Sequence, residues 1–237
     1  MAIDTTNRST AAEIMDNFDM EGEVLRDALD KIASINKLLG GNNVTLQGVK
    51  ELIRDTDQTK RIRIVDVGCG NGDMLRTLAD FAKRKKLNFE LYGIDANAYT
   101  IAHAKTLSSH YANISYIVAD IFDPETLKNP YDIILCTLTL HHFQDNELLK
   151  LMNEFKKAAN LGIVINDLHR SKLAYTLFKA ICFLFRLNDM SREDGLTSIL
   201  RGFKKDDLIK YAKQLNMKQS IIHWRWAFRY QWIIRTA

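Results

Sequence analysis

The spacing of apolar residues changes near residue 61. Before that point, apolar positions recur every three or four residues over 11–39 and again over 46–53, and this pattern predicts helices separated by Gly40 and Gly41. After it, short β-rich apolar runs alternate with stretches of helical spacing. We therefore expect an N-terminal helical cap over residues 1–60, followed by a sheet-based domain over residues 61–237.

The second part of the chain predicts a mostly parallel sheet. The expected strands are 62–67, 89–94, 114–119, 131–136 and 161–166, and the expected helices are 71–85, 98–108, 146–159 and 172–185. This alternation is typical of parallel strands covered by helices on both faces. A helix at 205–215 then precedes two runs, 218–224 and 227–234, that predict an antiparallel hairpin. The fold class is therefore α/β, a three-layer, doubly wound, Rossmann-like sheet with a C-terminal antiparallel hairpin.

Three glycines stand in five positions directly after the first expected strand. Gly68, Gly70 and Gly72 form the sequence GCGNG, and glycine lets the backbone turn sharply or approach a ligand closely. Dinucleotide-binding loops use G-x-G-x-x-G instead, and here Asp73 stands three residues after Gly70, where it would repel a pyrophosphate. No G-K-[ST] follows. The loop is either a tight turn without a ligand or a site for a ligand with little phosphate.

Two aspartates end the next two strands. Asp95 closes LYGID, where a carboxylate can accept both hydroxyls of a ribose. The alternative role is to cap the following helix, which Asn97 could do equally well. Asp120 closes VAD and suits the amino group of an adenine, or it is a turn carboxylate.

The ordered motifs IVDVGCGNG, GIDAN, VADIF and YDIILCTLTLHHF resemble those of class I S-adenosylmethionine-dependent methyltransferases, from about residue 62 to residue 165. The resemblance implies S-adenosylmethionine as the cofactor. It places residues of this chain at four parts of that molecule: Asp66, Gly68, Gly70 and Gly72 at the methionine, Asp95 and Ala96 at the ribose, Asp120 and Ile121 at the adenine, and Thr137 and Leu138 under the sulfonium.

The flanking segments 15–41 and 165–181 resemble a bacterial subgroup of this family that is often found beside polyketide synthases. This resemblance implies a small, rather apolar acceptor, such as a phenolic or polyketide-like hydroxyl. Methylation of carbon in a quinone-like ring is the close alternative. A partner subunit that binds the cofactor without turnover, and a nucleotide-dependent oxidoreductase that uses Asp95, are alternatives from other functional classes.

Methyl transfer to oxygen requires loss of a proton, so a nearby base helps. His141 and His142 follow the fourth expected strand, and His169 follows the fifth, two residues after Asp167. We expect His142 or His169 to act as the base, with Asp167 beside His169. Because neighbouring side chains alternate in direction, only one of His141 and His142 should point into the cleft, and His141 is assigned to acceptor binding.

The acceptor is expected under residues 170–203, a substrate-covering helix followed by a lid. Tyr175 and Phe178 belong to the helix 172–185, which has apolar residues on nearly every face and would roof the acceptor or form core or a dimer face. Residues 188–202 are expected to be a mobile lid or loop. Arg170 and Arg201 could hold an anionic group of the acceptor, or they are structural.

The composition of the chain limits which partners, metals and cellular locations we expect. The net charge is +4, the basic cluster Lys83–Lys86 suits a helix C-terminus, and a nucleic-acid partner is not expected. Cys69, Cys136 and Cys182 lack metal-ligand spacing, so no metal is expected and a reducing compartment is favoured. The first residues lack the order of a signal peptide, and the apolar stretch 173–187 is short and interrupted by charges. These features predict a cytoplasmic monomer or homodimer with no membrane span.

Overall fold

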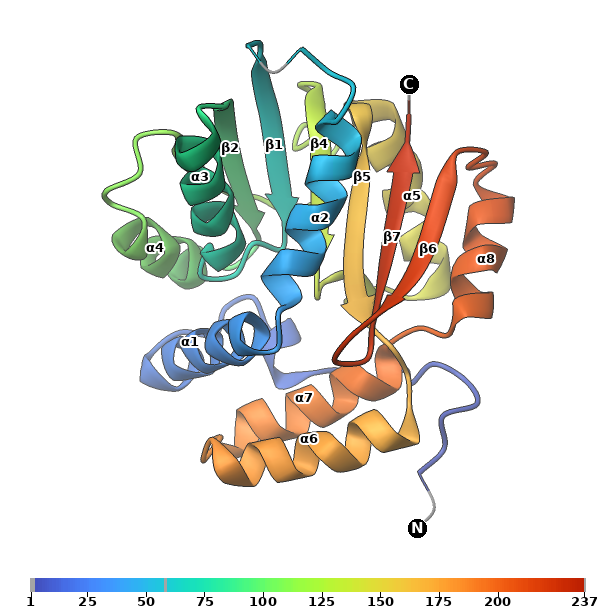
Figure 1. The fold of residues 1–237 in the computed structure, drawn as a ribbon. Coiled ribbons are helices and arrows are strands. Elements are labelled where there is room, and N and C mark those ends of the chain that lie inside the picture. Colours follow the sequence, from blue (N-terminus) through green and yellow to red (C-terminus); the bar gives the residue numbers. More distant parts are fainter. Residues whose placement is uncertain (1–2, 58, 237) are drawn as a thin grey trace.

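The computed structural model describes residues 3–57 and 59–236 and is built around one seven-stranded sheet (Figure 1). The strand order is β3-β2-β1-β4-β5-β7-β6, and β7 runs antiparallel to the strands on both sides of it, β5 and β6. The strands are β1 (Arg61–Val67), β2 (Asn88–Asp95), β3 (Ile114–Val118), β4 (Tyr131–Thr137), β5 (Ala159–Leu168), β6 (Ser220–Arg225) and β7 (Arg229–Arg235). The parallel sheet and the C-terminal hairpin are therefore confirmed.

Helices cover both faces of the sheet and its carboxyl edge. They are η1 (Ile14–Asp16), α1 (Glu23–Leu38), α2 (Gly41–Ile53), α3 (Asp73–Lys85), α4 (Ala98–Leu107), η2 (Leu140–His142), α5 (Asp145–Ala158), α6 (Lys172–Leu184), α7 (Asp189–Arg201) and α8 (Lys205–Gln214). In Figure 1, α2, α3 and α4 lie on one face, α5 lies behind the sheet and α8 beside β6, while α1, α6 and α7 lie below the carboxyl ends of the parallel strands.

Two apolar layers result because alternate side chains of each buried strand point to opposite faces. On β1, Ile64 packs with α2 and α3, whereas Val65 and Val67 pack with α5 and α8. Phe155 and Trp232 are fully buried in the second layer. Burial of an aromatic or aliphatic side chain of this size contributes about 1.5–3 kcal/mol. The double cover explains why the central strands read as continuous apolar runs.

The helix α2 begins at Gly41, five residues before the expected start at residue 46. It lies on the sheet, against β4, β5 and β7, and it forms part of one helical layer. Gly48 permits this packing, because a Cβ atom there would lie 2.5 Å from Cγ1 of Val164. Within the N-terminal part of the chain, α1 and the segment before it are the pieces that lie at the carboxyl edge (Figure 1).

Residues 188–202 were expected to be a mobile lid or loop, and the loop alternative is wrong, because this segment contains the helix α7 (Asp189–Arg201). Asn188 caps the helix by accepting a hydrogen bond from the Ser191 N–H at 2.8 Å. Gly195 lets the ring of Phe178 on α6 approach to where a Cβ atom would stand 2.4 Å away. The segment is polar and has little helical periodicity of its own, so packing between α6 and α7 outweighs its local sequence.

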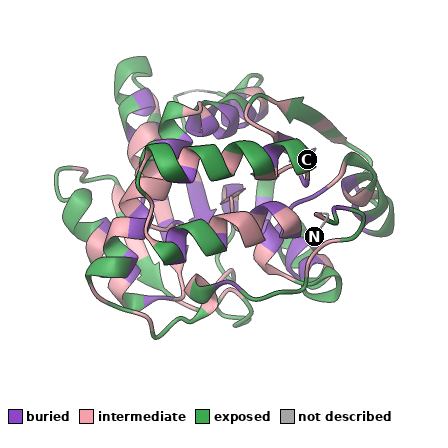
Figure 2. Ribbon diagram, turned by 90° about the horizontal axis from the view of Figure 1, so that it is seen from below, coloured by how far each residue is buried: buried purple, intermediate pink, exposed green. Residues whose placement is uncertain are grey.

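The N-terminal segment, residues 3–22, is held against the same edge. Arg8 pairs with Asp145 at 2.9 Å and donates to the carbonyl oxygens of His141 and Phe143 at 3.0 and 2.9 Å. Asp194 on α7 accepts hydrogen bonds from the Ile14 and Met15 N–H groups. The carboxyl edge of the sheet is therefore closed by α1, α6, α7 and this segment, whose outer residues are largely exposed or half-buried (Figure 2).

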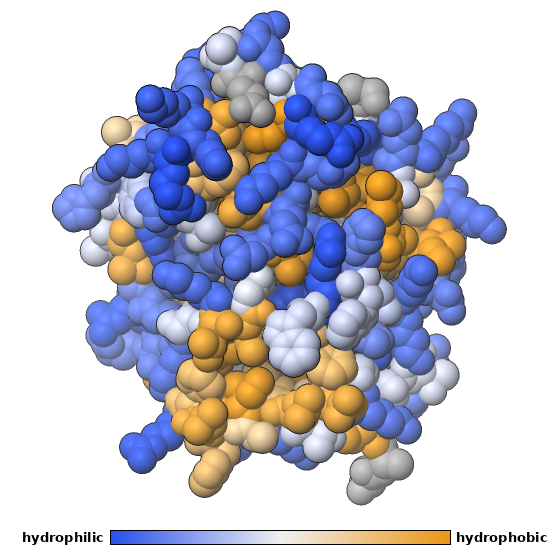
Figure 3. Space-filling view, in the orientation of Figure 1, coloured by the Kyte–Doolittle hydropathy of each residue, from blue (hydrophilic) through white to orange (hydrophobic). Residues whose placement is uncertain are grey.

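The outer face of α6 is apolar. The exposed large apolar residues of this helix are Leu173, Leu177, Phe183 and Leu184, and Phe183 is 88% exposed. Hydrophobic surface gathers over the lower helices in Figure 3. None of the helices in residues 3–57 and 59–236 has the length and apolar character needed to cross a membrane.

Candidate active site

The glycine loop joins β1 to α3 and takes a left-handed backbone at each glycine. Gly68, Gly70 and Gly72 have φ of 68°, 52° and 78°, a region that side-chain-bearing residues rarely occupy. A Cβ atom on Gly68 would lie 2.4 Å from the side chain of Thr139, and one on Gly72 would lie 2.0 Å from the Tyr116 hydroxyl. All three glycines are thus required by the turn itself, and the loop brings its backbone to the carboxyl edge of β1.

Asp95 links this loop to β2. Its two carboxylate oxygens accept from the backbone N–H groups of Gly70 at 3.1 Å and Asn97 at 3.0 Å. Asn97, rather than Asp95, caps α4 by accepting from the Thr100 N–H at 2.8 Å. The alternative capping role therefore belongs to Asn97. Asp95 fixes the glycine loop and remains at the carboxyl end of β2, and the half-buried Ala96 follows it.

Three carboxylates give this edge a negative field. Asp66, at the end of β1, is 2% exposed, and its Oδ1 has no hydrogen-bond partner among the described residues. Burial raises the pKa of Asp66 well above its usual value, and Asp73 and Asp95 raise it further. Burial also raises the pKa of Asp73 and of Asp95. Such a site favours a ligand that carries positive charge and donates a hydrogen bond to Asp66.

The end of β4 adjoins these groups. Thr137 and Thr45 of α2 share a hydrogen bond between hydroxyls at 3.0 Å. Leu138 follows with φ of 55° and donates its N–H to the carbonyl of Asn166. This left-handed residue turns the chain sharply out of the strand, as is common beside binding sites.

The expected adenine residues lie on the loop after β3. Asp120 is exposed and accepts from the Phe122 N–H at 2.9 Å, while Ile121 is half-buried and packs against the core on the α5 side of the sheet. The structure brings them to the carboxyl end of β3, the strand next to β2.

A cluster of buried titratable groups follows β4. His141 is 2% exposed, and its Nδ1 lies 2.7 Å from Asp167 on β5, which also accepts from the His141 backbone N–H. Burial would raise the pKa of Asp167, but the nearby His141 and its hydrogen bonds hold the pKa below its usual value. The rings of His141 and His142 lie with their centroids 4.3 Å apart and their planes tilted by 32°. Both rings therefore belong to one group of side chains.

Glu13 and Asp16 complete the cluster and were not predicted from the sequence. His142 Nδ1 lies 2.6 Å from Asp16, and its Nε2 lies 3.9 Å from Glu13. The Glu13 side chain is 4% exposed, and burial raises its pKa to about 7. Hydrogen bonds from His142 and Arg201 hold the pKa of Asp16 below its usual value, although burial opposes them. The two acids lie in a polar segment about 130 residues before the histidines, so no spacing could have revealed the contact.

Arg201 does not face an open acceptor site. It is 3% exposed, and it donates to Asp16 at 2.7 Å and to the carbonyl oxygens of Ala11, His141 and His142. These bonds tie α7 to the histidine loop and to the N-terminal segment. The expected role in binding an anionic acceptor group is replaced by a structural one.

Arg170 is likewise structural. It is 2% exposed, donates to the carbonyl oxygens of Thr5, Thr6 and Gly202, and pairs with Asp207 at 3.0 Å. Its fork of donors is occupied by the N-terminal segment and by the turn between α7 and α8. The expectation that it holds the acceptor is therefore not supported.

His169 stands apart from the cluster. Its Nδ1 accepts from Trp224 Nε1 at 3.2 Å, and its ring packs against Phe228 and Tyr230 of the hairpin. Burial lowers its pKa, and Arg170 adds to the effect. The expected pair of Asp167 with His169 does not form, because Asp167 is bound to His141 instead.

Tyr175 and Phe178 lie on α6 and are half-buried. Phe178 packs on Gly195 of α7, and the Tyr175 ring lies 5.0 Å from the Lys179 ammonium. The helix pair therefore covers the edge of the sheet, as expected for the roof of a site, and Phe178 also serves the packing between the two helices.

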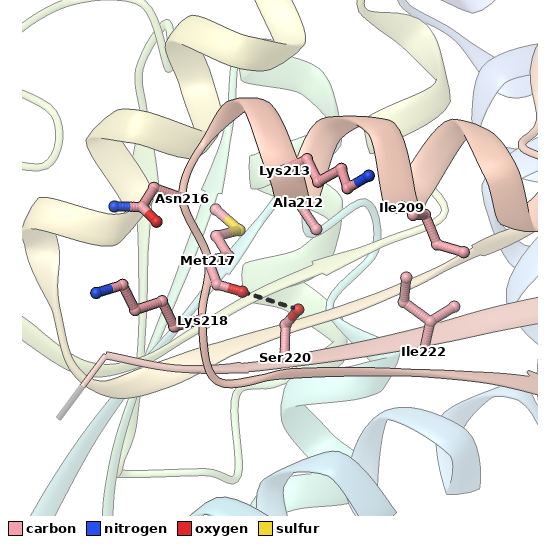
Figure 4. Close-up of a pocket in the computed structure, with 8 residues that line it drawn as sticks. All are labelled: Ile209, Ala212, Lys213, Asn216, Met217, Lys218, Ser220 and Ile222. Atoms are coloured by element: carbon pink, nitrogen blue, oxygen red, sulfur yellow. Dashed lines mark hydrogen bonds between the residues drawn. The ribbon is translucent and has the colours of Figure 1, made fainter.

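A shallow cavity of about 390 Å³ lies elsewhere, between α8 and β6 (Figure 4). It is lined by Ile209, Ala212, Lys213, Asn216, Met217, Lys218, Ser220 and Ile222. None of these lining residues is an acid or a histidine, so the cavity lacks the carboxylate or imidazole base expected for the reaction. The candidate active site is the carboxyl edge under α1, α6 and α7.

Known proteins of similar sequence and fold are methyltransferases. Residues 64–162 match the methyltransferase domain family. The chain is 29% identical to the tRNA U34 carboxymethyltransferase of Campylobacter curvus over 101 residues, which are 42% of this chain and 31% of that protein. It is 25% identical to the ubiquinone biosynthesis O-methyltransferase of Rickettsia felis over 132 residues, 54% of this chain and 50% of that protein. The chain thus spans half or less of these relatives.

A solved structure shares the fold over most of its length. The plantazolicin methyltransferase BpumL, in complex with SAH, superposes with a TM-score of 0.66 at 14% sequence identity. The match covers 89% of this chain and 90% of that one. At this identity the likeness concerns the fold, and it includes the regions on both sides of residues 64–162.

Proposed function

Because the chain belongs to the class I S-adenosylmethionine-dependent methyltransferase family, we propose that it transfers a methyl group from S-adenosylmethionine to a hydroxyl of a small, rather apolar acceptor. The observation that carries this proposal is the site at the carboxyl edge. A glycine loop, a buried unpaired carboxylate and a histidine cluster lie along the ends of β1, β2 and β4. Each matches a different requirement of the reaction.

The cofactor fits the charge of this site. S-Adenosylmethionine carries a sulfonium and an ammonium, and the three neighbouring carboxylates Asp66, Asp73 and Asp95 favour a cationic ligand. The unpaired Oδ1 of Asp66 is a ready acceptor for the ammonium group. Asp95 would accept the ribose hydroxyls, with the adenine at Asp120 and Ile121. NAD, with its pyrophosphate, would meet repulsion from Asp73 instead.

The histidine cluster supports activation of the acceptor. In the proposed reaction the acceptor oxygen attacks the methyl carbon, the carbon–sulfur bond breaks toward sulfur, and the acceptor proton is lost, which leaves S-adenosylhomocysteine. Holding the two reactants in line can supply about 7–11 kcal/mol of the acceleration. His142 is half-exposed whereas His141 is buried, so His142 is the histidine that can face the acceptor.

The acceptor is expected to be neutral near the cluster. Arg170 and Arg201 have their donors occupied, so neither provides a free guanidinium for a carboxylate. The roof formed by α6 contributes apolar side chains such as Phe178. A phenolic or polyketide-like hydroxyl fits these surroundings better than an acidic acceptor.

The experiment is to incubate the purified protein with S-adenosylmethionine and a panel of phenols and quinone-like compounds, and to measure S-adenosylhomocysteine and methylated product. The proposal expects turnover with a neutral hydroxyl compound, and loss of that turnover in Asp95→Ala. Product methylated on carbon would move the assignment to ring methylation. Cofactor binding without product from any acceptor class would favour a partner subunit instead.

A further inference from the structure

The ring nitrogens of two histidines converge on one buried carboxylate. His141 Nε2 lies 3.6 Å from Glu13 Oε1, and His142 Nε2 lies 3.9 Å from Glu13 Oε2. One ligand-type atom of each of the three residues lies within 4.8 Å of the other two. The three residues come from the N-terminal segment and from η2, so the tertiary fold brings them together.

These separations are too long for hydrogen bonds. Two of the atoms, Glu13 Oε1 and His141 Nε2, are buried and have no hydrogen-bond partner among the described residues. An unpaired buried polar atom costs about 1–3 kcal/mol. Two such atoms that face each other are therefore suited to bind one common partner.

A metal ion accounts for the spacing. Zinc binds histidine nitrogen at about 2.0–2.1 Å and carboxylate oxygen at about 2.0–2.2 Å. At a tetrahedral angle, two such bonds separate the ligand atoms by about 3.3–3.5 Å. The separation of 3.6 Å between His141 Nε2 and Glu13 Oε1 lies just above this range. His142 Nε2 lies 3.9 Å from the other oxygen, Glu13 Oε2, so a rotation of the half-exposed His142 ring is needed for it to reach the same ion.

The opposite nitrogen of each ring is held by a carboxylate. Asp167 lies 2.7 Å from His141 Nδ1, and Asp16 lies 2.6 Å from His142 Nδ1. This arrangement places the proton on Nδ1 and directs the lone pair of Nε2 toward Glu13. Metal-bound histidines almost always have such an outer partner, which fixes the tautomer and the ring orientation.

The carboxylates of the cluster also favour binding of a cation. Four carboxylates gather here: Glu13, Asp16, Asp167 and Asp194. Arg201 pairs with two of them, and its Nη1 lies closer to Asp16, at 2.7 Å, than to Glu13, at 3.7 Å. Ser198 donates to Glu13 Oε2 at 2.8 Å, which leaves Oε1 free.

We propose that Glu13, His141 and His142 bind a divalent transition-metal ion through Oε1 of the glutamate and Nε2 of each histidine. Two imidazoles and one carboxylate suit zinc, iron or a similar ion rather than magnesium or calcium. Three protein ligands leave at least one coordination position for another molecule, as in catalytic metal sites. If the proposed function holds, that position binds the acceptor hydroxyl and lowers its pKa, so that its proton is released more easily; ion binding itself does not depend on that function.

The test is calorimetric titration of the chelator-treated protein with Zn²⁺, repeated with Co²⁺ while its visible absorption is recorded. The proposal predicts one equivalent of each ion and a tetrahedral or five-coordinate cobalt spectrum. Glu13→Gln and His142→Ala should each weaken binding by more than about 100-fold, and Asp16→Asn by about 10- to 100-fold, as for an outer partner. His110→Ala, at an exposed histidine away from the cluster, is the matched control and should bind as the unaltered protein does.

Circular dichroism establishes that each variant is folded before titration. Failure of the unaltered protein to bind one equivalent would overturn the proposal. Binding by Glu13→Gln and His142→Ala that is as tight as binding by the unaltered protein would also overturn it, because it would indicate adventitious surface binding. Titration of the metal-free protein with S-adenosylhomocysteine separates this inference from the proposed function. Zinc binding without cofactor binding would leave the metal site standing and remove the methyltransferase assignment.

Discussion

Asp167 binds His141, with Oδ1 and Nδ1 2.7 Å apart and both side chains at most 2% exposed. The pair joins the end of β5 to η2, the turn that follows β4. It fixes the orientation of a ring whose other nitrogen faces Glu13. Removal of one partner of a buried pair leaves the other uncompensated, so this contact constrains both the fold and the site.

The half-exposed His142 is expected to be needed for turnover rather than for cofactor binding. His142→Ala should lower kcat/KM by about 10²–10⁴-fold, the usual range for loss of a group that assists proton removal. The affinity of this variant for S-adenosylhomocysteine should differ little from that of the unaltered protein. Steady-state kinetics and calorimetry on the same preparation measure both. A loss of affinity that matches the loss of activity would mean that the ring supports the cofactor instead.

Asp66 is expected to reduce the stability of the free protein while serving the ligand. Burial raises its pKa in the folded state, so the fold favours the protonated acid, and stability falls as pH rises from its unfolded pKa through the folded one. Asp66→Asn removes this cost at pH 7 and should raise the free energy of unfolding by about 1 kcal/mol.

The same substitution should weaken cofactor binding, because an amide attracts the ammonium less than a carboxylate does. Denaturant unfolding at pH 5 and pH 8 checks the stability effect, whose size should be larger at pH 8. A variant that is less stable than the unaltered protein at both pH values would contradict the assignment of Asp66 as an unpaired, ligand-directed carboxylate.

Arg170 should act on stability and leave the acceptor unaffected. Arg170→Met keeps much of the side-chain volume but leaves Asp207 and several carbonyl oxygens without a donor, so the free energy of unfolding should fall by about 3–5 kcal/mol. The Michaelis constant for the acceptor should stay within about twofold, well below the tenfold change that 1.4 kcal/mol would give. Urea unfolding and kinetics below the transition measure these effects. An increase of the Michaelis constant by more than tenfold with unchanged stability would restore a binding role.

The contact between α6 and α7 gives a structural prediction. Gly195→Ala places a methyl group 2.4 Å from the Phe178 ring and should destabilise the protein by about 1–3 kcal/mol through overpacking. Combining it with Phe178→Leu should recover part of the loss, since the smaller side chain makes room. Thermal unfolding of the two single variants and the double variant measures the coupling. Additive losses would show that the two positions do not touch.

Much of the fold followed from local pattern. Runs such as IRIVDV and YDIILC are apolar on both faces, which predicts buried parallel strands, and the glycine loop marks the turn between β1 and α3. The helix α7 was missed because its polar sequence, NDMSREDGLTSILRG, has weak helical periodicity. Its capping residue Asn188 was present, but the packing on α6 that stabilises it is a tertiary effect.

The candidate site, like the fold, could be predicted from the sequence only in part. The expected cofactor residues stand at fixed points of successive strand ends, so sequence order places them on one edge. The partners of the histidines could not be read from spacing, because Glu13 and Asp16 reach His142 across more than 120 residues. Arg170 and Arg201 misled for a similar reason: several of the carbonyl groups that occupy them, those of Thr5, Thr6 and Ala11, belong to the N-terminal segment, which no pattern locates.

The most direct test of the account is calorimetric titration with S-adenosylhomocysteine and, in parallel, with NADH, for the unaltered protein, for Asp95→Ala and for Asp120→Asn as a milder change at the same edge. The account predicts micromolar binding of S-adenosylhomocysteine alone, with loss of at least about 100-fold, or roughly 2.7 kcal/mol, in Asp95→Ala while its circular dichroism is unchanged. Binding of NADH, or equal binding of S-adenosylhomocysteine by Asp95→Ala, would contradict it.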